Sequence, residues 1–163
     1  MEPIFRPGLV GLMAAFALAA PLPAFATLGS DQASIEADRL AMTGNAMPVV
    51  NAAGYTVHGY TLPSGTVVRE YLATASASGK VFAVAWEGPF KPDLGQLLGA
   101  RQFAAVDEGA RERNREGRRG PMSLRPAGAG NLVIESSGHM RAFTGRAWLS
   151  DQLPTGVDAD AIR

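Results

Sequence analysis

Hydrophobic residues gather in about five short segments of the chain, and in the last two of these segments they alternate with polar residues, as in β-strands with one buried face. Aromatic and β-branched residues fill these segments, and proline, glycine and serine separate them. The predicted strands are Tyr55 to Leu62, Thr66 to Ala73, Lys80 to Trp86, Asn131 to Ser136 and Met140 to about Leu149. They predict an antiparallel sheet of about five strands, built from a three-strand meander and a C-terminal hairpin.

The third predicted strand, KVFAVAW, is apolar on both of its faces. Small and large side chains alternate along it: Val81, Ala83 and Ala85 on one face, and Phe82, Val84 and Trp86 on the other. A strand of this kind is covered on both sides. We expect a helix against the alanine face, because small side chains allow close approach. The larger face needs another cover, and the candidates are the first helix, a long loop or a second subunit in a homodimer.

Two segments have the periodicity of helices. A short N-terminal helix is predicted from Ser30-Asp31 to about Met42, and Ala46 to Gly54 is expected to be an irregular connection. The main helix begins at Asp93 and weakens after Glu108. Its apolar stripe consists of Leu94, Leu97, Leu98 and Ala105. Together with the sheet, these helices predict the α+β class.

The C-terminal hairpin contains SSGHMRAFTGRAW, from Ser136 to Trp148. A two-residue turn at Ser137-Gly138 or at Gly138-His139 fits the preferences of hairpin loops. Either turn places His139 at or beside the tip. Gly145 is expected to bend or bulge the second strand and so to displace Arg146 and Trp148 from simple alternation.

The N-terminus has the anatomy of a secretory signal peptide. Arg6 is followed by an apolar run from Gly8 to Ala20, and Ala24-Phe25-Ala26 is a cleavage signal of small residues. The apolar run is shorter than the roughly 20 residues of a membrane-spanning helix. We therefore predict a signal peptide over 1–26, cleavage at the Ala24/Ala26 signal, and a single domain over 27–163 without a transmembrane span. The expected location is the periplasm or the extracellular space.

The amino-acid composition limits the kinds of catalytic and metal-binding sites that the chain can form. The chain has no cysteine and two histidines, His58 and His139, and its 15 basic and 15 acidic residues cancel. Thiol catalysis and thiolate metal sites are excluded, and a zinc site would depend mostly on carboxylates. Zero net charge gives no general attraction to nucleic acid. We expect no cofactor, no metal and no nucleic-acid partner.

The one basic segment is rich in arginine and glycine and is expected to be a flexible part of the domain, over 110–130. Its cations are Arg111, Arg113, Arg115, Arg118, Arg119 and Arg125, tempered by Glu112 and Glu116. Composition favours a solvated segment. In an exported protein, the alternative is contact between Arg111–Arg125 and an anionic component of the cell envelope.

Serine and histidine at the hairpin invite comparison with hydrolases. A serine nucleophile needs a base within hydrogen-bond reach and a group that orients the base, and neighbours across a tight turn rarely meet this demand. We therefore expect a structural turn and assign no catalytic residues. The alternative is a small hydrolase or lyase that uses His139 with Glu70 or Glu135. A candidate surface for a ligand or partner comprises Arg69, His139, Arg141 and Arg146.

Four blocks of the sequence resemble a family of exported bacterial proteins known as domain of unknown function 2844. The blocks are SGTVVREY (64–71), VFAVAWEGP (81–89), PDLGQLLG (92–99) and GHMRAFTGRAWLSDQLPTGV (138–157). The resemblance implies a secreted single domain without assigned activity, so it transfers no catalytic residues. Ser137 stands where the family often has a second glycine, and the arginine-rich segment lies outside the blocks. The resulting hypothesis is an exported, non-enzymatic binding or structural module whose ligand and role the sequence does not identify.

Overall fold

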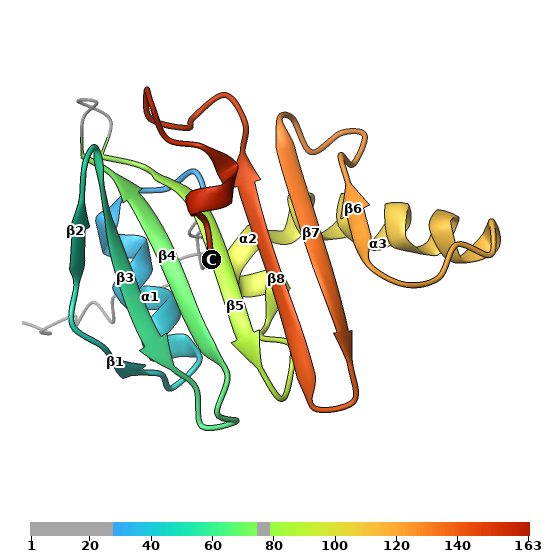
Figure 1. Ribbon diagram of the computed structural model, residues 1–163, viewed down its shortest axis with the longest axis horizontal. Helices are drawn as coiled ribbons and strands as arrows, with labels where there is room; N and C mark the ends of the chain where they lie inside the picture. Colours follow the sequence, from blue (N-terminus) through green and yellow to red (C-terminus); the bar gives the residue numbers. More distant parts are fainter. Residues whose placement is uncertain (1–27, 75–78) are drawn as a thin grey trace, which may run out of the picture.

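The computed structural model describes residues 28–74 and 79–163 and shows an antiparallel sheet with helices on one side and the C-terminal segment on the other (Figure 1). Its strands are β1 (Asn45–Ala46), β2 (Val50–Ala52), β3 (Tyr55–Thr61), β4 (Val67–Ala73), β5 (Val81–Gly88), β6 (Met122–Leu124), β7 (Leu132–His139) and β8 (Ala142–Leu149). The helices are α1 (Gln32–Ala41), α2 (Leu94–Leu98) and α3 (Ala100–Arg115), followed by the 3₁₀ helix η1 (Ala159–Ala161).

The α+β class and the antiparallel sheet are confirmed, but the prediction of about five strands is wrong. The sheet has 8 strands in the order β1-β3-β4-β5-β8-β7-β6, and β2 also pairs with β3. The additional strands β1, β2 and β6 have two or three residues each and lie at the sheet edges. Such short strands carry no measurable alternation, so the pattern placed β1 and β2 beside or within an irregular connection.

The predicted helices are present with different bounds. Asp31 caps α1 as expected, since its carboxylate accepts hydrogen bonds from the amides of Ala33 and Ser34 at 3.0 and 3.3 Å. The main helix is divided at Gly99, whose φ of 85° is incompatible with a continuous helix. Beyond this break α3 continues to Arg115. The last turns of α3 and the strand β6 therefore lie within segment 110–130.

The side of the sheet behind the strands in Figure 1, here called the helix face, packs against α1, α2 and α3. Leu97 and Leu98 of α2 and Val106 of α3 contact the centre of the sheet, and Ile35 of α1 contacts the upper part of β4 and β5. The buried sheet residues on this face include Val68, Val84, Trp86, Leu132, Ile134 and Ala147. Removing such side chains from water is the main stabilising contribution to the fold.

The opposite side, here called the C-terminal face, is covered by the chain after β8. Ile162 is 1% exposed and packs with Val157 and Ala159 against the sheet. The sheet residues that they cover include Tyr71, Phe82, Ala83, Ala85, Val133 and Trp148. The expectation that the main helix packs on the alanine face is therefore wrong, because α2 and α3 lie against Val84 and Trp86 instead.

The expected assignment of side chains to the two faces of β5 is also wrong at Phe82, because the strand contains an irregularity. Tyr71 pairs with Ala83, but the next residue, Leu72, pairs with Val81, so Phe82 is an extra residue in the ladder. Such a bulge places Phe82 on the same face as Ala83. Phe82, Val84 and Trp86 are each at most 1% exposed within one chain. They offer no surface for a second subunit, which removes the basis for a homodimer through this face, one of the three candidate covers.

The C-terminal hairpin turns later than predicted. His139 pairs with Ala142, so the two loop residues are Met140 and Arg141 rather than Ser137-Gly138 or Gly138-His139. Arg141 adopts a positive φ of 64°. The predicted bulge at Gly145 is also absent, since pairing runs without a shift through Gly145 to both β5 and β7. Arg146 and Trp148 therefore share the C-terminal face with Glu135 and Val133.

The predicted signal peptide and the cleavage residues Ala24 and Ala26 lie outside the described residues. Within 28–74 and 79–163, none of the helices is both long enough and apolar enough to cross a bilayer.

Candidate functional site

The four residues of the candidate ligand surface do not converge. His139 and Arg141 are exposed at the hairpin tip and line an open depression of about 740 Å³ together with Glu87 and Phe143. Arg146 lies higher on the C-terminal face and lines a different depression, of about 590 Å³. Arg69 pairs with Ala85 across β4 and β5 and borders neither depression. The predicted surface is thus three separate positions.

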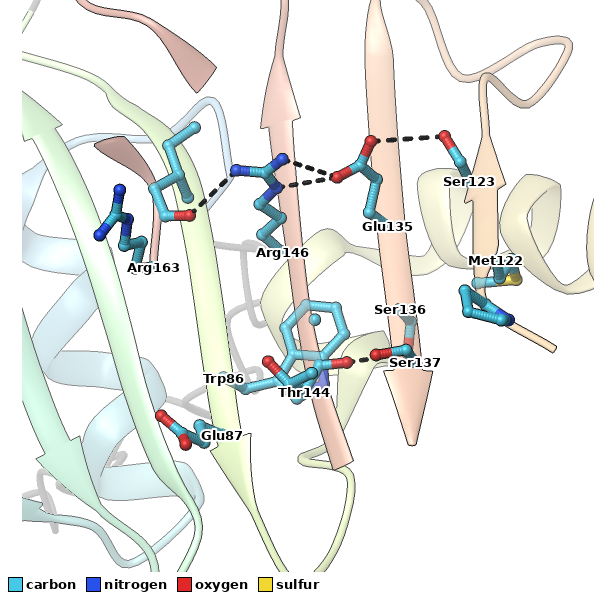
Figure 2. Close-up of a pocket in the computed structure, with 13 residues that line it drawn as sticks. Trp86, Glu87, Met122, Ser123, Glu135, Ser136, Ser137, Thr144, Arg146 and Arg163 are labelled. Atoms are coloured by element: carbon cyan, nitrogen blue, oxygen red, sulfur yellow. Dashed lines mark hydrogen bonds and ion pairs between the residues drawn. The ribbon is translucent and has the colours of Figure 1, made fainter. Parts of the chain in front are cut away.

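Arg146 is the anchor of the C-terminal segment (Figure 2). Its guanidinium donates to the Glu135 carboxylate at 2.9 Å and to the carbonyl oxygens of Ala159 and Ile162 at 2.7 and 3.3 Å. The same group lies 5.3 Å from the centroid of the Trp148 ring. These contacts occupy much of its hydrogen-bonding capacity and hold the chain after β8 against the sheet. Arg146 is therefore mainly structural.

The hydrolase or lyase alternative is not supported by the geometry. Glu70 pairs with Val84 and points to the helix face, whereas His139 lies on the opposite face. Glu135 shares the face of His139 but precedes it by four residues, about 13 Å along a strand. Ser136 also points to the helix face, and its hydroxyl donates to the carbonyl of Thr144 at 3.4 Å. His139 thus has neither acid nor Ser136 as a catalytic neighbour.

A buried polar cluster between the sheet and the helices was missed by sequence reasoning. The Tyr60 hydroxyl donates to Glu70 at 2.7 Å, and the Gln96 amide donates to Asp38 at 2.6 Å. Asp38 and Glu70 are both fully buried. Burial, and then the Glu70 carboxyl group, raise the pKa of Tyr60 far above its usual value. The cluster borders none of the depressions described here and joins α1 and α2 to β3 and β4.

A clue to this cluster was present in the first helix. Asp38 lies three residues after Ile35 and four before Met42, so it shares the apolar stripe of the helix. A carboxylate on such a stripe must find polar partners inside the protein.

The exposed end of the β7–β8 hairpin is hollowed on both faces of the sheet. Three depressions meet there, and Ser137 borders all of them. In Figure 2, Ser137 and Thr144 lie side by side on neighbouring strands, below Arg146 and Glu135. The chain after β8 covers the upper part of this face only, where Val133 and Trp148 are buried.

The third depression, here called the basic cleft, lies between the end of α3 and the hairpin and has a volume of about 370 Å³. Its cationic lining residues are Lys91, Arg113, Arg118 and Arg119, and it has no acidic lining residue. The other polar groups in its wall belong to Asn114, Ser136 and Ser137. Three of the cations come from the arginine-rich segment outside the family blocks, and two of these, Arg118 and Arg119, lie beyond the end of α3.

The described residues contain no group of three histidine, aspartate or glutamate side chains arranged to hold a metal ion. His58 cannot assist His139, because His58 pairs with Glu70 and faces the helices. Burial lowers the pKa of His58, whose ring lies 3.1 Å from the Thr56 hydroxyl.

Comparison with known proteins identifies a family but no activity. The family model for a protein of unknown function, DUF2844, matches residues 24–162. No curated protein and no solved structure matches the chain. The family match covers the sheet, the helices and the hairpin with its three depressions. The chain therefore belongs to the DUF2844 family of proteins of unknown function.

Proposed function

We propose that this protein is an exported, non-enzymatic binding protein whose ligand surface is the exposed end of the β7–β8 hairpin, from Ser136 to Phe143. The observation that carries the proposal is the meeting of three depressions at Ser137. A binding site is usually a concave surface with a few polar groups on a rigid element. The hairpin fits this description, because β8 pairs with β5 along six of its residues.

The edge of β7 adds hydrogen-bonding capacity to this surface. The outer strand β6 pairs with Ile134, Glu135 and Ser136 of β7, and this pairing does not extend beyond Ser136. The following residues of β7, from Ser137 to His139, have no strand on their outer side within the described parts of the chain. Their main-chain groups are available to a ligand.

Export supports a binding role outside the cytoplasm and follows from the leader features of the sequence. The cleavage residues Ala24 and Ala26 precede the first core residue, Leu28, which is 4% exposed. Cleavage after Ala26 therefore leaves the described fold complete. We place the mature protein in the periplasm or in the extracellular space.

A ligand screen on the mature protein tests this proposal. The panel comprises neutral sugars, carboxylates, phosphates and short peptides, and amide chemical shifts from NMR locate each ligand that binds. We expect shifts to concentrate at residues 135–145. Ligands that bind only elsewhere, or a panel without any binding, would contradict the proposal.

A bulky substitution at Ser137, the residue that borders all three depressions, tests the same surface by mutation. Ser137→Trp is expected to weaken any ligand of the hairpin, because Ser137 borders each depression. The control is Val50→Trp at the opposite edge of the sheet, where Val50 is 59% exposed. Equal affinity in the two variants would argue against the hairpin as the binding surface.

A further inference from the structure

We infer that the basic cleft binds the phosphate group of a small ligand, a phosphomonoester or a diphosphate. The inference rests on the proposed function and assigns a ligand class to one of its three depressions. Its basis is the uncompensated positive charge of the cleft, together with a concave shape and neutral hydrogen-bond donors.

Three of the six arginines of the arginine-rich segment are paired with neighbouring carboxylates. Arg111 pairs with Asp107 at 2.7 Å, and Arg115 pairs with Glu108 at 2.9 Å and also with Glu112. These residues lie along the exposed side of α3, outside the cleft. These ion pairs reduce the net positive charge along the exposed side of α3.

Two of the three arginines of the segment that have no ion pair among the described residues, Arg113 and Arg119, line the cleft. Of its cations only Arg118 has an ion-pair partner among the described residues, Glu116. Arg113, Arg119 and Lys91 form no ion pair with any residue in 28–74 or 79–163. Three uncompensated charges around one concavity favour an anion that itself carries more than one charge. A phosphomonoester, with about −1.5 to −2 at neutral pH, meets this condition.

Two of the cations are held in place before any ligand binds. The Arg113 guanidinium donates to the carbonyl oxygens of Pro121 at 2.7 Å and of Gly120 at 3.3 Å, which fixes the loop after α3 beside the helix. The Lys91 ammonium lies 5.8 Å from the centroid of the Phe143 ring, on the hairpin wall. A preorganised cation loses less conformational entropy on binding than a free one.

The type of donors in the cleft and its small volume favour phosphate over other anions. Arginine presents a planar fork that matches phosphate oxygens, and Asn114 and Ser137 add neutral donors. The volume of about 370 Å³ is at the small end of ligand pockets and suits a phosphate with a small substituent. The carbonyl end of α3 opposes an anion, since a helix C-terminus carries partial negative charge. Part of this effect is offset because Arg113 and Arg115 place positive charge in the last turn of α3.

Calorimetric titration of the mature protein with inorganic pyrophosphate is the test. We expect binding that weakens as salt rises, because the contact is between charges near the surface. The double variant Lys91→Gln/Arg119→Gln removes two exposed cations and should raise the dissociation constant about tenfold or more. The control Arg101→Gln/Arg125→Gln removes the same charge outside the cleft and should leave binding within about twofold.

Two further measurements distinguish phosphate from other anions and a lipid headgroup from a soluble phosphate. Citrate carries several carboxylates, and citrate binding as tight as that of pyrophosphate would overturn the phosphate assignment. Vesicles of phosphatidylcholine with phosphatidic acid, against vesicles without it, test a lipid headgroup as the source. Binding of these vesicles or of soluble pyrophosphate alone supports the inference and identifies which source the cleft accepts.

Failure of this inference is distinguishable from failure of the proposed function. If neither pyrophosphate nor the vesicles with phosphatidic acid bind, or if the cleft variant and its control lose affinity equally, the phosphate site is wrong. A neutral ligand that shifts residues 135–145 in the same protein would then still support the hairpin as the binding surface.

Discussion

At the scale of the residue, the absence of a side chain at Gly145 makes room for the buried ring of Trp86. A Cβ atom at this position would lie 2.2 Å from Cζ2 of Trp86 and 2.8 Å from the Glu135 carbonyl oxygen. Gly145→Ala is therefore expected to lower the free energy of unfolding by about 1–3 kcal/mol, because the Trp86 ring must move within a packed core. Denaturant unfolding of the two proteins measures this difference.

The matched control is a glycine where a methyl group has room. At Gly109, within α3, a Cβ would meet Leu124 at an ordinary 3.4 Å. Gly109→Ala should leave stability unchanged or raise it by up to about 1 kcal/mol, since alanine is the better helix former. A loss of stability equal in both variants would show that the contact with Trp86 is not the cause.

Tyr60 links a single hydroxyl to the stability of the fold. Tyr60→Phe removes the donor to the buried Glu70 carboxyl group and should lower the free energy of unfolding by about 1–3 kcal/mol. Tyr55→Phe is the control, because the half-buried Tyr55 hydroxyl has no hydrogen bond to another described residue, and should change stability by less than about 0.5 kcal/mol. Denaturant unfolding at neutral pH compares the variants, and equal losses would contradict the role of the Tyr60 bond.

Tyr60 also makes the stability of the fold depend on pH in the alkaline range. The raised pKa of Tyr60 keeps its hydroxyl protonated in the folded protein, while the unfolded chain loses this proton above its usual pKa of 10.0. The unfolded state then binds fewer protons, so stability falls as the pH rises above about 10. Unfolding free energies measured at neutral and alkaline pH should show a smaller fall in Tyr60→Phe than in the wild type. An identical fall would contradict the assignment.

At the scale of the element, long segments were predictable and short or irregular ones were not. Runs of apolar, aromatic and β-branched residues located β3, β4, β5, β7 and β8, because each strand is long enough to bury several side chains. The bulge at Phe82 is invisible to alternation, since both faces of β5 are apolar. The turn was misplaced because glycine suggested Gly138, whereas the buried pairs Leu132–Leu149 and Ile134–Ala147 fix the register and put Arg141 in the loop.

Apart from the 3₁₀ helix η1, the C-terminal segment after β8 is irregular, and its docking on the sheet rests on few side chains. Ile162→Ala should lower the free energy of unfolding by about 2–5 kcal/mol, because Ile162 is 1% exposed against the sheet. Val50→Ala, at a position that is 59% exposed, should cost less than about 0.5 kcal/mol. Chemical denaturation measures both values, and a negligible loss for Ile162→Ala would mean that the segment does not cover this face in solution.

At the scale of the whole molecule, the candidate site could be predicted only in part. The hairpin and the arginine-rich segment were each singled out from the sequence, but their meeting at Ser137 depends on where α3 ends relative to β7. Lys91 carried no sequence signal, since a single lysine between prolines is unremarkable until the fold places it over Phe143. Charges far apart along the chain become a site only through the packing of the helices on the sheet.

The first residue of the mature protein depends on where the signal peptide is cleaved, and the core contacts of Leu28 require cleavage before that residue. Leu28 is 4% exposed, its amide donates to Leu97 at 3.2 Å, and the Gly29 amide donates to Val81 at 2.8 Å. Mass spectrometry of the exported protein should find Thr27 as the first residue, because cleavage after Ala26 keeps these contacts. A chain that begins at Ser30 should be less stable than one that begins at Thr27 by about 2 kcal/mol or more. A mature form that begins beyond Leu28, with undiminished stability, would contradict both the cleavage site and the role of Leu28 in the core.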